Sequence, residues 1–223
     1  YNFVQRPFTK MELQLPDKYK RLTYSYLALR KAVGWIGILL PFVLLLGNTL
    51  IFSGGAGKPS ISLYYHTPMR DVLVGGLCAV ALFLFFYSGY DRWDNITANL
   101  AGFFALLIAF FPASETGPAG VSDFIHFLAA GLLLSCLVIF SLFLFTKDDG
   151  NPTPRKIIRN RIYIVCGVVM TATLVSLLIY LIFKRSDHMS TPFIFWAETV
   201  ALVAFGISWL TKGGTLYPDK EDL

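Results

Sequence analysis

Six ionisable side chains stand beside or inside apolar stretches of this chain, where a charge is costly to bury. These side chains, called the outer cluster here, are His66, Arg70, Asp71, Asp123, His126 and Glu198. Each falls at the same predicted end of its apolar stretch, so the six could meet at one cavity. An ionisable residue inside such a stretch usually faces a partner or a water-filled space. Glu198 is the deepest, about 9 Å beyond Pro192 on a helix.

Three kinds of chemistry fit the outer cluster. In the first, Glu198, His126 and Arg70 form a buried ionic or hydrogen-bonded lock between helices. In the second, His66, His126 and one or two carboxylates, Glu198 foremost, hold a zinc ion whose open position would activate water. In the third, Arg70 binds an anionic headgroup, and His126 with Glu198 titrates near neutral pH. No HExxH motif or paired-histidine helix decides between them.

A second group of charges lies at the opposite predicted ends of the apolar stretches. Its basic run is Arg155, Lys156, Arg159 and Arg161. Capping and salt bridges explain this group, with Asp94 or Asn95 as the N-cap of the third stretch. The alternative is a cytoplasmic site for an anionic headgroup or phosphate, in which the arginines donate paired hydrogen bonds.

Four other residues with metal-binding chemistry carry no motif. Cys78, Cys136 and Cys166 fall in three different apolar stretches and lack the spacing of a metal knuckle or redox pair, so we expect them to be small apolar filler. His188, in KRSDHMS, is expected to be a solvated loop residue.

Six apolar stretches must position these clusters. They are residues 33–53, 71–89, 95–112, 123–146, 162–183 and 193–211. About 18 apolar residues suffice to cross the roughly 30 Å hydrocarbon core as a helix. Charged residues make up 15% of the chain, against about 25% in soluble domains. The sequence therefore predicts an all-α fold, a polytopic bundle of six transmembrane helices, and excludes a soluble enzyme or nucleic-acid-binding domain.

The predicted organisation has three parts. Residues 1–32 form a basic segment in which Lys and Arg alternate with Leu and Tyr. This segment is either an interfacial amphipathic helix or a basic lead-in to the first span. Residues 33–211 form the transmembrane domain, and residues 212–223 form a short tail.

The distribution of basic residues predicts the orientation. With six spans both termini share one side, and that side holds fifteen of the nineteen lysines and arginines. Loops rich in Lys and Arg stay in the cytoplasm. We therefore expect both termini to be cytoplasmic, in a multi-pass protein of the cell membrane.

Several segments together resemble an uncharacterised family of bacterial six-span membrane proteins of unknown function. They are YYHTPMRDV, GYDRWDNITANLAG, the FP pair at 111–112, SDFIHF and RNRIY. The resemblance covers spans two to six. It implies a bacterial inner-membrane protein and brings no established activity.

A second resemblance is to the membrane hydrolases that include alkaline ceramidases and adiponectin-receptor-like proteins. Ser122 and His126 form the Ser-x-x-x-His of that group, which implies zinc binding. The chain departs from the pattern because it lacks His-x-x-x-His, has six predicted spans rather than seven, and places Ser-x-x-x-His late and on the outer side. Only Ser122 and His126 carry over.

Two classes of function follow from these patterns. The first is a non-enzymatic protein that binds a lipid or small ligand, or an accessory subunit, with membrane lipids and other membrane subunits as partners and no nucleic acid. The second is a metal-dependent hydrolase of lipids at the outer leaflet, in which Glu198 or Asp123 relays a proton from metal-bound water.

Overall fold

The computed structural model describes residues 17–52, 55, 57–115, 120–148, 150–183 and 192–218. These residues are helical or lie in short connections, and no strand occurs among them. The elements are α1 (Asp17–Leu46), η1 (Gly47–Ile51), η2 (Ser62–His66), α2 (Arg70–Phe85), α3 (Arg92–Phe110), α4 (Val121–Ile139), η3 (Phe140–Leu144), α5 (Pro154–Phe183) and α6 (Phe193–Lys212). The all-helical prediction is confirmed for this part of the chain.

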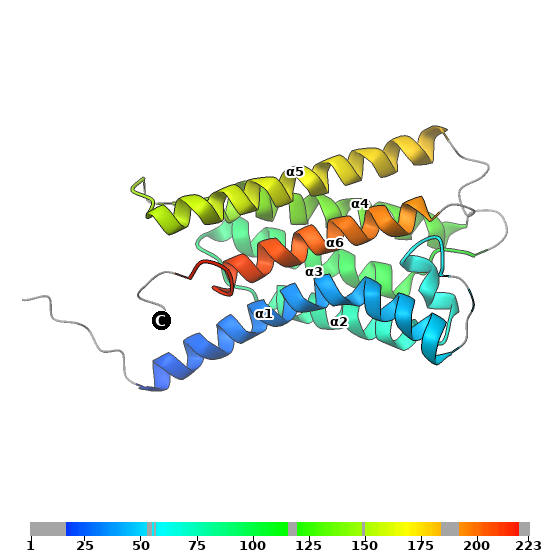
Figure 1. The fold of residues 1–223 in the computed structure, drawn as a ribbon, viewed down its shortest axis with the longest axis horizontal. Coiled ribbons are helices and arrows are strands. Elements are labelled where there is room, and N and C mark those ends of the chain that lie inside the picture. Colours follow the sequence, from blue (N-terminus) through cyan, green and yellow to red (C-terminus); the bar gives the residue numbers. More distant parts are fainter. Residues whose placement is uncertain are drawn as a thin grey trace, which may run out of the picture.

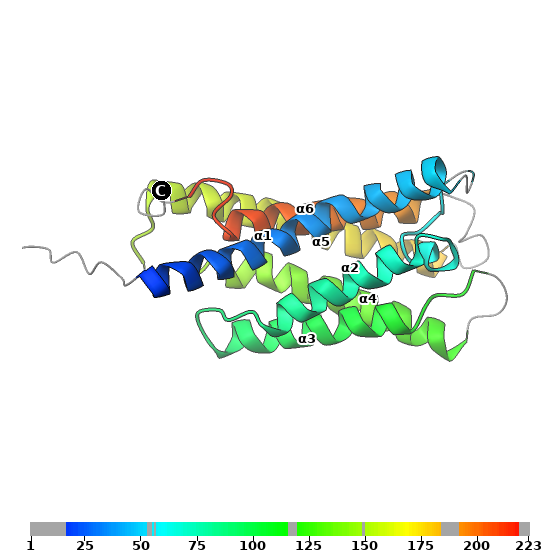
Figure 2. The ribbon, with the colours of Figure 1, turned by 90° about the horizontal axis from the view of Figure 1, so that it is seen from below.

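The six α-helices run alternately up and down a single bundle (Figures 1 and 2). Each packs against its neighbour in sequence, and α1 packs against α6, so the helices form a closed ring. One end of the bundle carries η2 and the first residues of α2, α4 and α6. We call it the η2 end, and the other the Lys147 end.

Five of the helical segments are long and apolar enough to cross a membrane. They are Leu27–Ile51, Arg92–Phe110, Val121–Leu144, Pro154–Phe183 and Phe193–Lys212. The remaining helix, α2, was predicted over 71–89 but ends at Phe85. Its 16 residues rise about 24 Å, less than the roughly 30 Å of a hydrocarbon core.

The basic N-terminal segment is continuous with the first apolar stretch. Helix α1 begins at Asp17 and continues through position 32 without a break, and Pro41 lies inside it without ending it. η1 then continues the chain as a π-helix to Ile51. Residues 1–16 lie outside the described part of the chain.

Small residues allow the closest helix contacts. A Cβ added to Gly206 of α6 would stand 2.5 Å from the carbonyl oxygen of Gly34 in α1. A Cβ on Gly102 of α3 would stand 3.0 Å from the carbonyl oxygen of Ala81 in α2. Small residues at helix interfaces are characteristic of membrane bundles, because they let two backbones approach closely.

Large apolar side chains cover much of the outside of the bundle. Leu50, Phe86, Ile182 and Phe183 are each at least 70% exposed. A soluble monomer rarely exposes such side chains in large contiguous areas. This surface agrees with the five membrane-length helices.

Aromatic side chains fill the interior of the bundle toward the Lys147 end. The Trp209 ring lies 5.1 to 5.4 Å from the rings of Tyr87, Phe140, Phe145 and Phe205, measured between centroids. This packing leaves the other half of the interior, toward η2, as the place for a cavity.

Candidate functional site

A cavity of about 220 Å³ lies inside the ring of helices toward the η2 end. All six α-helices and η2 contribute to its wall, which is almost entirely apolar. The polar residues that line it are Ser62, Tyr65, His126, Tyr180 and Glu198. The cavity thus has apolar walls and a few polar groups, as ligand sites commonly do.

The line of contact between α4 and α5, called the α4–α5 seam here, borders the cavity on one side and the outside of the bundle on the other. Phe127 of α4 and Leu178 of α5 both line the cavity, yet they are 47% and 49% exposed. Nearer the Lys147 end the chain closes this seam, since Gly167 of α5 lies directly against Leu142 and Ser141 of η3.

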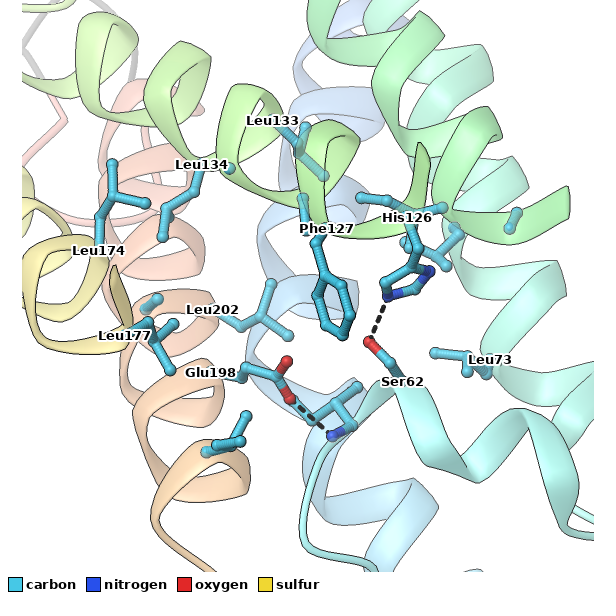
Figure 3. Close-up of a pocket in the computed structure, with 18 of the residues that line it drawn as sticks. Ser62, Leu73, His126, Phe127, Leu133, Leu134, Leu174, Leu177, Glu198 and Leu202 are labelled. Atoms are coloured by element: carbon cyan, nitrogen blue, oxygen red, sulfur yellow. Dashed lines mark hydrogen bonds between the residues drawn. The ribbon is translucent and has the colours of Figure 1, made fainter. Parts of the chain in front are cut away.

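His126 and Ser62 form a hydrogen-bonded pair at the edge of the cavity (Figure 3). The His126 side chain is almost fully buried, with Nδ1 2.8 Å from the carbonyl oxygen of Phe111 and Nε2 2.8 Å from Ser62 Oγ. Because a carbonyl oxygen only accepts, Nδ1 carries a proton and donates it. In the neutral ring Nε2 is then an acceptor, and the Ser62 hydroxyl donates to it.

Glu198 lies on the same side of the cavity and holds the segment just before Ser62. Its carboxylate accepts hydrogen bonds from the Ile61 backbone N–H at 2.6 Å and from the Ser60 hydroxyl at 3.1 Å. Ser60 Oγ in turn accepts from the backbone N–H of Ser62 at 3.1 Å. One hypothesis from the sequence paired Glu198 with His126 and Arg70, whereas its hydrogen bonds go to Ser60 and Ile61.

Four side chains hold the segment between α3 and α4, one for each residue from Phe111 to Ser114. His126, Ser122 and His66 donate to the carbonyl oxygens of Phe111, Pro112 and Ala113, each at 2.8 Å. These contacts join η2 and α4 to the segment that follows α3.

Asp123 makes the fourth contact with this segment. Its carboxylate accepts from the backbone N–H groups of Ser114 and Gly120 at 2.6 and 2.8 Å, and from the Ser114 hydroxyl at 2.9 Å. Asp123 is buried, and its oxygens are committed to the loop and to the first turn of α4.

An ion pair joins two loops outside this segment. Lys58 Nζ lies 2.5 Å from Glu115 Oε1. The hydrogen bond from Lys58 lowers the pKa of Glu115, with its opposite charge adding to the effect. Glu115 therefore stays ionised at pH values below the usual pKa range of a carboxyl group.

The outer cluster is only partly brought together. His126 and Glu198 line the cavity, whereas Arg70 and Asp71 are exposed in the first turn of α2, with the Arg70 guanidinium 4.7 Å from the Tyr65 ring centroid. His66 is exposed and bonded to Ala113. His188 lies outside the described residues.

The predicted zinc site stays a prediction. Among the described residues, no three His, Cys, Asp or Glu side chains group closely enough to hold a metal ion. Zinc binding by His126 would require the release of a hydrogen bond from one of its two ring nitrogens.

At the Lys147 end, most of the basic run contacts main-chain oxygens. Arg155 and Arg159 donate to the carbonyl oxygens of Pro218 and Tyr217. Lys156 Nζ donates to the carbonyl oxygen of Phe145 at 2.8 Å. Arg161 is exposed. Three of the four predicted anion contacts thus hold the chain after α6 and the end of η3.

The carboxylates of this end pair with Lys147. Its Nζ lies 2.8 Å from Asp91 and 3.1 Å from the fully buried Asp94. The hydrogen bond from Lys147 lowers the pKa of Asp91 to about 2. Asp91, not Asp94 or Asn95 as predicted, is the N-cap of α3, and Asp94 completes the capping box.

Sequence reasoning missed Ser62, whose hydroxyl lines the cavity, and Ser60, whose hydroxyl donates to Glu198. They lie in KPSISLYY, directly after a Gly- and Pro-rich loop. A usable signal existed, because the Glu198 carboxylate, expected inside a span, needed donors, and this loop falls at the same predicted end of the spans.

Comparison with protein-family models, curated protein sequences and solved structures finds no match to this chain.

Proposed function

We propose that this protein is a six-span membrane protein with both termini on the cytoplasmic side, which holds one apolar chain of a lipid or similar small ligand in its cavity. One observation carries the proposal: an apolar cavity of about 220 Å³ whose polar groups gather at one edge. A dry cavity of about 150 Å³ holds benzene, so this one has room for a segment of hydrocarbon chain rather than a whole lipid.

The shape of the site supports a ligand with two chemically different parts. The leucines of α4 and α5, among them Leu134, Leu174 and Leu177, suit the hydrocarbon (Figure 3). Ser62 and His126 suit a polar group at the chain's end, since both can exchange hydrogen bonds there. The α4–α5 seam is the route by which a chain would enter from the surrounding lipid.

Mass spectrometry of lipids and small molecules that co-purify with the detergent-solubilised protein tests this proposal. Gly131 lines the cavity, and a Cβ added to it meets nothing within 4 Å. Gly131→Phe is therefore expected to fill the cavity without a backbone clash and to reduce bound ligand at least about tenfold, the effect of roughly 1.4 kcal/mol.

Gly75→Phe is the matched control. Gly75 is also helical with open space around it, but it is exposed on α2 and does not line the cavity. It should leave the bound ligand unchanged. Equal ligand content in the wild type and both variants, or none in any, would contradict the proposal.

A further inference from the structure

Ser62 and His126 have the relative geometry of a serine nucleophile and its general base. Ser62 Oγ and His126 Nε2 are 2.8 Å apart, within the hydrogen-bonding reach that proton transfer needs. The pair lies at the cavity wall, so a bound molecule can meet the serine oxygen. We infer that Ser62 is a nucleophile that cleaves a carboxylic ester whose apolar acyl chain occupies the cavity. This inference rests on the proposed function.

The tautomer of His126 suits this role. A serine is activated when Nε2 is free to accept its proton and a third group holds the opposite ring nitrogen. Here the Phe111 carbonyl oxygen, 2.8 Å from Nδ1, is that third group. The main chain at Phe111 is itself fixed, since Ser122, His66 and Asp123 hold the next three residues.

The backbone at Ser62 is held independently of His126. Glu198 binds the Ile61 N–H and the Ser60 hydroxyl, and Ser60 Oγ accepts from the Ser62 N–H. Glu198 is therefore a positioning residue: it acts on the serine through Ser60 and Ile61. This anchoring fixes the attacking oxygen in advance, as efficient catalysis requires.

The cavity selects the substrate class. Its almost wholly apolar wall disfavours a charged or strongly hydrated acyl group, because burying polar groups without partners is costly. An unbranched hydrocarbon chain running along the α4 and α5 leucines would place its carboxyl carbon at the polar edge, beside Ser62. The substrate is thus an acyl ester such as those of membrane lipids.

The reaction proceeds in two balanced steps. In the first, Ser62 Oγ bonds to the ester carbonyl carbon while its proton moves to His126 Nε2. The bond from that carbon to the alcohol oxygen then breaks, and the leaving alcohol takes the proton from Nε2. In the second, water attacks the acyl-serine with the same proton transfer, which releases the carboxylic acid and restores Ser62.

An alkyl fluorophosphonate tests the nucleophile directly in the purified full-length protein. Attack by Ser62 Oγ would form a serine–phosphorus bond and expel fluoride, and mass spectrometry of the peptide that carries Ser62 would show the adduct. Ser62→Ala should abolish this adduct. His126→Asn, which keeps a donor for the Phe111 carbonyl but lacks the base, should slow its formation about 100-fold or more.

Two further variants separate this inference from a purely structural role of the pair. Ser176→Ala also removes a half-buried hydroxyl, yet Ser176 is bonded to the Thr173 carbonyl oxygen within α5 and does not line the cavity, so labelling should persist. Glu198→Gln should slow labelling less than His126→Asn. Retention of the wild-type elution volume and unfolding temperature is the criterion for including any variant.

The outcomes are distinguishable from those for ligand binding. Lipid in the wild type that is lost in Gly131→Phe, together with no adduct at Ser62, overturns the nucleophile and leaves ligand binding intact. An adduct that forms equally fast in His126→Asn also overturns the inference. Labelling that depends on Ser62 and His126, with release of carboxylic acid from a nitrophenyl ester of an eight-carbon acid, supports it.

Discussion

Polar side chains at the η2 end are paired mainly with main-chain atoms. His66, Ser122 and His126 donate to carbonyl oxygens, while Asp123 and Glu198 accept from backbone N–H groups. A buried polar group without a partner costs free energy, so each of these bonds stabilises both its side chain and a loop. The polar side chains thereby fix irregular backbone where it meets the helices.

Asp123→Asn is expected to lower the free energy of unfolding by about 1–3 kcal/mol. The new amide nitrogen would face backbone N–H donors that the carboxylate now satisfies. Thermal unfolding in detergent measures the effect. Asp71→Asn, in the first turn of α2 but exposed, is the control and should change stability by less than about 0.5 kcal/mol.

Apolar neighbours in the sequence were sufficient to identify His126 as a buried polar residue and Glu198 as a polar residue inside the bundle, where it is half-buried. The sequence was not sufficient to identify their partners. The partners are backbone atoms of Ile61 and Phe111 and the hydroxyls of Ser60 and Ser62. The residue types of Ile61 and Phe111 do not indicate that their backbone atoms would be the partners. Charge complementarity suggested Arg70 instead, which lies outside the cavity.

Helix existence was well predicted from apolar runs, while helix ends were less so. α6 was expected over 193–211 and spans Phe193–Lys212, since its apolar run is bounded by charge and Gly. α5 begins at Pro154, eight residues before the apolar run, because the basic segment after Pro154 is also compatible with a helix. An apolar run marks the part of a helix that can lie in lipid, and it does not mark the residue at which the helix begins.

The contact between α1 and α6 depends on glycine at position 206. A methyl group there would meet the Gly34 carbonyl oxygen at 2.5 Å and Ile38 at the same distance. Gly206→Ala is therefore expected to destabilise the bundle by about 1–3 kcal/mol in thermal unfolding. Gly75→Ala, with nothing within 4 Å, should be neutral or slightly stabilising; equal effects of the two changes would disprove tight α1–α6 packing.

The whole molecule combines an apolar exterior with basic side chains gathered at the Lys147 end. That end carries Lys147, Lys156, Arg155 and Arg159 close to the two carboxylates Asp91 and Asp94. Positive charge near membrane spans favours the cytoplasmic side. The η2 end, and the cavity beside it, would then open toward the outer leaflet.

This orientation predicts which engineered cysteines a membrane-impermeant maleimide can reach in intact cells. In a variant lacking Cys78, Cys136 and Cys166, Asp71→Cys at the η2 end should be labelled from outside. Asn151→Cys, exposed at the Lys147 end, should react only after the membrane is permeabilised. The reverse pattern, or labelling of both from outside, would refute the proposed topology.

Closure of the ring by α1 and α6 also has a consequence for biosynthesis. Helix α1 can contact α6 only after the ribosome has added roughly 170 further residues. This takes on the order of ten to thirty seconds at typical elongation rates. Until then the glycine face of α1 around Gly34 has no permanent neighbour, and the ring cannot enclose its cavity. The nascent bundle is therefore open on one side throughout most of translation, when insertion factors or lipids can cover that face.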